Sequence, residues 1–111
     1  MVTVDVRFEL RGGPDKEAQA AHMEYLRLAF EGKTEEIQHA YATRHSNKAF
    51  SKALLRELHA WLSKIQHHTE NQWWRLGRIC VCSMTVLLSN ARGETILAVN
   101  VVDKFVEWHT E

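Results

Sequence analysis

The first ten residues alternate between apolar and polar side chains. Even positions from Val2 to Leu10 are apolar, and odd positions from Thr3 to Glu9 are polar or charged. This period of two predicts a β-strand with one side on a core and the other in water. The following sequence RGGP, residues 11–14, ends the strand because glycine and proline favour turns.

Helical spacing of apolar residues begins after this turn. Pro14, followed by acidic residues, predicts a helix start, and Gly32 predicts its end just after Phe30. Thr34 then predicts the N-cap of a short second helix that ends near Thr43. The expected core stripe of the first helix is Ala18, Ala21, Tyr25, Leu28 and Ala29, with Leu26 at the margin.

A third helix has the clearest apolar stripe in the chain. Ser46 or Asn47 can cap its start, and the periodicity weakens near His67 and His68. Apolar residues that recur at three- and four-residue steps predict a core-facing helix of about five turns. They are Phe50, Leu54, Leu58, Trp61, Leu62 and Ile65.

The period returns to two in the last third. Residues 78–89 and 94–108 predict two strands, and Asn90 to Gly93 predicts the tight turn between them. We therefore expect a single α+β domain over residues 1–111. Its element order would be β-α-α-α-β-β, with three helices packed on one face of a small, mainly antiparallel sheet.

The last two predicted strands are apolar on both sides, and three helices can cover only one face of a sheet. The uncovered face predicts association with a partner, most simply as a symmetric homodimer. The adjacent tryptophans of the sequence NQWWRLG point to opposite sides if that segment is extended. The association candidates are Trp73, Trp74, Leu97, Val99, Val101 and Phe105, with Trp108 less favoured.

Charge is uneven along the chain, although the net charge is zero. Residues 44–78 contain seven basic and two acidic residues, whereas the segments before and after them are acidic. This asymmetry predicts a basic face on the third helix, which suits either phosphate groups or an acidic protein. The contact candidates are Lys48, Lys52, Arg56, His59 and Arg75.

Catalytic chemistry has little support in the sequence. We find no nucleophile elbow, phosphate-binding loop or zinc-protease motif, and Cys80 and Cys82 alone are a weak metal signal. We therefore expect no metal and no cofactor. A small-ligand or acid–base pocket with His22, Tyr25 and Tyr41 remains a third hypothesis, although a core histidine is the commoner role for His22.

These patterns together favour a small binding protein of the inhibitor, immunity or adaptor kind, rather than an enzyme. Nucleic-acid binding by the basic helix is the alternative. The start of the chain lacks the pattern of a secretion signal, and its longest apolar run is too short to cross a membrane. With two closely spaced cysteines that suit reduced thiols, these features lead us to expect a cytoplasmic protein.

Overall fold

The computed structural model describes residues 2–13, 15–69 and 79–102. The described chain contains two long helices and three strands, in the order β-α-α-β-β. The elements are β1 (Thr3–Arg11), α1 (Lys16–Ala42), α2 (Asn47–Thr69), β2 (Cys80–Ser89) and β3 (Thr95–Val102).

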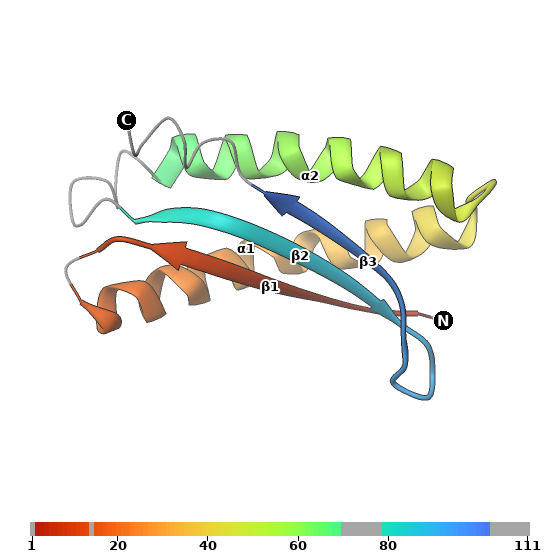
Figure 1. Cartoon of the computed structure of the whole chain (residues 1–111), viewed down its shortest axis with the longest axis horizontal. Helices are drawn as coiled ribbons and strands as arrows, with labels where there is room; N and C mark the ends of the chain where they lie inside the picture. The colour runs from red at the N-terminus through yellow and green to blue at the C-terminus, as the bar shows by residue number, and fades with distance from the viewer. Residues whose placement is uncertain (1, 14, 70–78, 103–111) are drawn as a thin grey trace.

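The three strands form one antiparallel sheet in the order β1-β2-β3. Val86 at the centre of β2 lies opposite Val6 on one side and Val99 on the other. Both helices lie on the same side of this sheet, so the architecture has two layers (Figure 1). The expected α+β class and antiparallel sheet are confirmed.

The expected count of three helices is wrong, because α1 runs without a break through Gly32. Thr34 does not cap a new helix; its hydroxyl donates to the Glu31 carbonyl, 2.8 Å away. A mid-helix glycine costs about 1 kcal/mol relative to alanine. The buried stripe keeps one helical phase on both sides of Gly32, so packing outweighs this cost. That stripe consists of His22, Leu26, Phe30 and Ile37.

The expected core stripe of the first helix also needs correction. The sequence pattern predicts Leu28 in the core, yet 56% of it is exposed, whereas Leu26, predicted at the margin, is completely buried. Ala21 is exposed as well. The alanines and Tyr25 predict a buried side that is rotated about the helix axis from the actual one. Packing of the large side chains of Leu26 and Phe30 sets the actual buried side.

Both helices begin at capping residues. Asp15 Oδ1 accepts a hydrogen bond of 2.8 Å from the Ala18 backbone N–H at the start of α1. Ser46 Oγ accepts one of 3.1 Å from the Ala49 N–H at the start of α2. Of the two caps that the sequence left open, Ser46 therefore fills the role.

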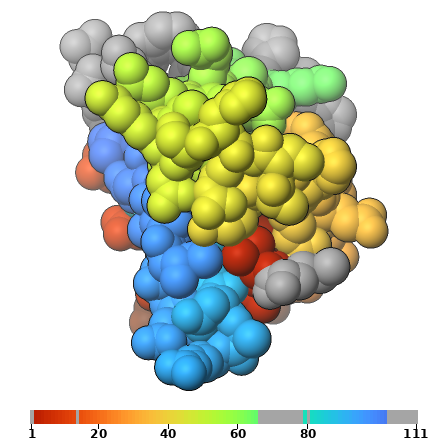
Figure 2. Space-filling view, turned by 90° about the vertical axis from the view of Figure 1, so that its right-hand side faces the viewer, coloured from red at the N-terminus to blue at the C-terminus, as the bar shows by residue number. Residues whose placement is uncertain are grey.

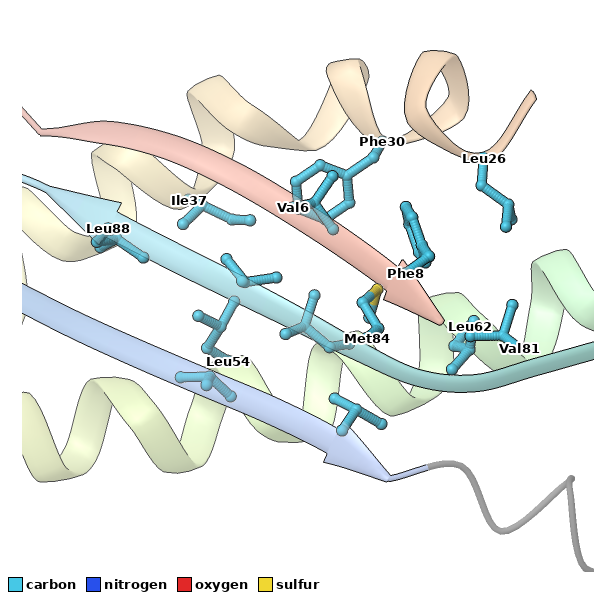
Figure 3. Packing of buried hydrophobic residues seen from close by; sticks show 14 of the residues in the cluster. Val6, Phe8, Leu26, Phe30, Ile37, Leu54, Leu62, Val81, Met84 and Leu88 are labelled. Atoms are coloured by element: carbon cyan, nitrogen blue, oxygen red, sulfur yellow. The ribbon is translucent and has the colours of Figure 1, made fainter. Parts of the chain in front are cut away.

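Aromatic side chains from the two helices and the sheet pack against one another. The Trp61 ring on α2 meets the edge of Phe30 on α1 at a centroid distance of 5.6 Å and lies 6.3 Å from Phe8 on β1. Apolar residues from the helix-facing side of every strand complete this core (Figure 3). Its buried members include Val6, Leu54, Leu58, Leu62, Val81, Met84, Val86, Leu88, Val99 and Val101.

A β-bulge in β2 changes which of its residues face the core. Glu9 pairs with Ser83 and Leu10 pairs with Val81, so Cys82 is an extra residue without a partner on β1. Val81 and Met84 are both fully buried although they are three positions apart. Strict alternation would have placed Cys82 beside Met84, and the bulge replaces it with Val81.

Candidate functional site

The face of the sheet opposite the helices is not covered by any described element (Figure 1). β1 presents charged side chains there, and β2 and β3 present mainly uncharged ones. We call this surface the open face. It consists of Asp5, Arg7 and Glu9 on β1, Ser83, Thr85 and Leu87 on β2, and Ile96, Ala98, Asn100 and Val102 on β3.

The open face is apolar towards β3. Val102 is 69% exposed and Ile96, at a second bulge, is 38% exposed. Leu87 lies opposite Ala98 between them. Across the same face the Asn100 amide donates to Thr85 Oγ1 at 2.7 Å, which fixes a polar cross-strand pair within the patch. Apolar and hydrogen-bonding groups thus lie side by side.

The residues expected to line the association surface lie elsewhere. Val99 and Val101 are buried beneath the helices and Leu97 packs against the same core, which corrects their expected placement. Their exposed neighbours occupy the open face instead. The pairing register decides which side of β3 faces the helices. Because both sides of β3 are largely apolar, its sequence alone does not indicate that register. Trp73, Trp74, Phe105 and Trp108 lie outside the described residues.

The residues expected to form a basic face lie on α2, except for Arg75. Lys48, Lys52 and Arg56 are all exposed, and we call them the basic face; His59 is half-buried at its end. They lie on the opposite side of the helix from the buried stripe of Phe50, Leu54 and Leu58. Among the described residues none of these three cations forms an ion pair. Arg75 lies outside the described residues.

The three pocket candidates do not form one site. The rings of His22 and Tyr25 stack with centroids 6.2 Å apart and planes inclined by 13°. Tyr41 lies further along the same continuous helix, which at about 1.5 Å per residue places it roughly 28 Å from His22. His22 is completely buried. Burial lowers its pKa from 6.5 to about 4, so its ring is neutral near pH 7.

Tyr41 instead lines a groove that was not expected. An open groove of about 970 Å³ lies between the end of α1 and the β2–β3 turn, and Val2, Gln38, Asn90 and Ala91 are among its lining residues. The turn projects away from the helices at this end of the molecule (Figure 2). The groove arises from three segments far apart in the sequence, at Val2, the end of α1 and the β2–β3 turn, and so no local pattern indicates it.

Arg44 lines one side of the groove, and its guanidinium group is held in place by several contacts. The Arg44 guanidinium lies over the Tyr41 ring, 3.7 Å from its centroid. Arg44 Nη1 donates to the Tyr41 carbonyl at 2.8 Å, and Nε donates to Asn47 Oδ1 at 2.6 Å. Glu35 and Glu36 line the same groove. The charges around it are therefore mixed, and they select neither an anionic nor a cationic ligand.

Within the part of the chain that the structure describes, no three His, Cys, Asp or Glu side chains cluster as metal ligands would. No described helix is long and apolar enough to cross a membrane. Comparison of the chain with models of known families, with curated proteins and with solved structures finds no match. Function must therefore be inferred from the surfaces described above.

Proposed function

We propose that this chain is a small, non-enzymatic binding protein that acts by protein–protein association through the open face. The observation that carries the proposal is Val102, an apolar side chain 69% exposed on a sheet face that no described element covers. Ile96 and Leu87 add apolar surface further along the same face, beyond the Thr85–Asn100 pair. Exposed apolar side chains on an uncovered sheet face are typical of an interaction surface.

The composition of the open face supports the same proposal. Protein interfaces combine apolar residues with a polar rim, and on the open face Leu87 lies beside the charged Asp5 of β1, while Val102 and Ile96 lie on the far strand β3. A flat strand surface also holds its side chains in fixed positions, which lowers the entropy lost on binding. The catalytic alternative lacks comparable support, because the candidate acid–base residue His22 is buried and separated from Tyr41.

A photoreactive amino acid at position 102, introduced in living cells, tests this proposal. Leu28 is a matched control because it is 56% exposed on α1, on the opposite side of the molecule. We expect crosslinking to a defined protein partner from position 102 and none from position 28. The Ile96→Asp substitution in the same chain should abolish the crosslink, because it places a charge among the apolar side chains of the same open face.

Two results would contradict the open face as the binding surface. One is equal crosslinking from positions 102 and 28, which would indicate random collision. The other is a crosslink that persists unchanged with Ile96→Asp, which would show that the apolar area does not contribute to binding. Retention of the folded circular dichroism spectrum by the Ile96→Asp variant completes the control.

Nucleic-acid binding is the second candidate function, and the basic face supports it. Lys48, Lys52 and Arg56 are exposed at successive four-residue steps. Side chains at this spacing share one side of a helix and can contact neighbouring phosphates together. An acidic protein surface would satisfy the same cations, so the basic face is also compatible with association.

A further inference from the structure

The β1 strand forms an edge of the sheet. It pairs with β2 on one side, and no other described strand pairs with it. Every second residue of an edge strand turns its backbone N–H and C=O away from the sheet, where another strand can bind them. β1 is nine residues long and regular, so this edge is long enough for a strand-to-strand contact.

Helix α1 holds β1 at its two ends. Gln38 Nε2 donates to the Val2 carbonyl at 2.8 Å, and Gln19 Nε2 donates to the Gly12 carbonyl at 2.7 Å. Between these points, an open cleft of about 100 Å³ lies between the strand and α1, lined in part by Val4, Asp5 and Val6. Solvent therefore reaches the strand in its N-terminal half, away from Gly12.

Asp5 and Arg7 have no charged neighbour on the adjacent strand β2. Asp5 lies opposite Leu87 and Arg7 lies opposite Thr85, so each charge faces an uncharged neighbour. Both side chains are exposed, and neither forms an ion pair with a described residue. Edge strands often carry charges of one kind, which repel a second copy. Alternating acid and base along one side is instead self-complementary in an antiparallel pair.

We propose that β1 pairs antiparallel with β1 of a second copy, about a two-fold axis at Val6. Asp5 then lies opposite the partner's Arg7, and Arg7 lies opposite the partner's Asp5. On the core side Val4 faces the partner's Phe8. The two sheets become one sheet of six strands, and their open faces lie on the same side. The dimer leaves both open faces uncovered, so each copy can still bind a partner there. This is the only point at which the inference rests on the proposed function.

The side-chain charges exclude the adjacent register, and the accessibility of the strand separates the proposed register from the next one. A one-pair shift, centred on Arg7, sets Arg7 against itself and Asp5 against the partner's Glu9, which is repulsive. A further shift, centred on Phe8, sets Arg7 against the partner's Glu9 and is attractive. That register moves the contact towards Arg11, away from the half of the strand that borders the open cleft at Val4 and Val6. The axis at Val6 combines complementary charges with the accessible half of the strand.

Charge reversal tests both the pairing and its register. Asp5→Arg places arginine opposite arginine, and Arg7→Asp places aspartate opposite aspartate. Each substitution should raise the dimer dissociation constant by at least about tenfold, because like charges directly opposite each other are destabilising. A mixture of the two variants should recover a heterodimer, since the introduced arginine of one chain then faces the introduced aspartate of the other. Molar mass from light scattering measures each state.

Glu9→Arg is the matched control for register. Glu9 is exposed on the same strand and faces the partner's uncharged Thr3 in the proposed dimer, so this variant should remain dimeric. Dissociation by Glu9→Arg would instead show the register centred on Phe8 and overturn the axis at Val6. The doubly reversed Asp5→Arg/Arg7→Asp chain should form homodimers, which excludes misfolding as the cause of dissociation in the single variants.

The proposal is overturned if the wild-type chain is monomeric, if both single reversals leave it dimeric, or if the mixture does not recover a heterodimer. None of these outcomes affects crosslinking from Val102 on the open face. Failure of the edge pairing and failure of the proposed function are therefore separate results.

Discussion

Asp5 on β1 lies directly opposite Leu87 on β2, so a carboxylate and an apolar side chain are cross-strand neighbours on the open face. The pair marks the boundary between the charged strand at the edge and the apolar area of β2 and β3. Each side of this boundary suits a different contact, because the charges complement a second β1 and the apolar area suits a protein partner. The following predictions test the core that supports these surfaces and then the surfaces themselves.

The buried His22 should make stability depend on pH. Its pKa is 6.5 in the unfolded chain and about 4 in the folded one, so below pH 6.5 the unfolded state binds a proton that the folded state does not. The contribution of neutral His22 to the free energy of unfolding is therefore fully present above pH 6.5, and it is lost as the pH drops towards 4. We expect a loss of about 2 kcal/mol between pH 7 and pH 5, measured by urea unfolding.

Substitution identifies the residue responsible for this pH dependence. His22→Leu should remove most of the difference between pH 7 and pH 5, because the group that titrates is gone. His45→Leu should retain it, since His45 is exposed. An equal pH dependence in the wild type and the His22→Leu variant would contradict the assignment.

Two adjacent leucines on α2 should differ strongly in their effect on stability. Leu54 is 4% exposed and Leu55 is 37% exposed, although they share a helix and a residue type. Leu54→Ala should cost about 2–5 kcal/mol, because it leaves a cavity in the core. Leu55→Ala should cost less than about 1 kcal/mol. Denaturant unfolding of both variants measures the difference, and similar costs would show that α2 packs in another orientation.

Two glycines should respond to alanine in opposite directions. Gly13 has a φ of +93°, and a Cβ there would lie 2.8 Å from Ile79 Cγ1, so Gly13→Ala should destabilise the fold by about 1–3 kcal/mol. Gly32 lies in the middle of α1, with open space where its Cβ would be. Gly32→Ala should therefore stabilise by about 1 kcal/mol. Thermal unfolding measures both, and destabilisation by Gly32→Ala would contradict a continuous α1.

The nucleic-acid alternative predicts a salt-dependent interaction at the basic face. Changing Lys48, Lys52 and Arg56 to glutamate should abolish binding to a mixed-sequence oligonucleotide, because phosphate contacts and counterion release are lost. A triple variant with Lys16, Arg27 and Arg92 changed to glutamate has the same net charge and should still bind. Fluorescence anisotropy over a range of salt concentrations measures both. Binding retained by the Lys48, Lys52 and Arg56 variant would exclude the basic face as the nucleic-acid site.

Local periodicity was sufficient to predict most elements of this fold. The alternation from Val2 to Leu10 and the stripe from Phe50 to Ile65 each follow a single period, so they indicate β1 and α2 directly. Gly32 was misleading because a local helix-ending signal competed with tertiary packing, and packing of Phe30 and Ile37 prevailed. Propensity is a local quantity, whereas the benefit of a continuous buried stripe depends on the opposing sheet.

The candidate site was less predictable than the fold. Exposure of Lys48, Lys52 and Arg56 follows from helical phase alone and was expected. The open face depends on the strand register and on the bulge at Cys82, which reverses the alternation of β2 relative to its neighbours. The groove at Tyr41 depends on the approach of the β2–β3 turn to α1. Neither of these long-range relationships is contained in a local sequence pattern.

The molar mass of the wild-type protein in solution is the most direct measurement of association. Light scattering on a size-exclusion column, at micromolar concentration and physiological salt, should give twice the chain mass of 12.9 kDa. The mass should fall only partly at high salt, because salt screens the Asp5–Arg7 pairs but not the backbone hydrogen bonds between strands. A mass of one chain at every concentration and salt would contradict self-association through β1.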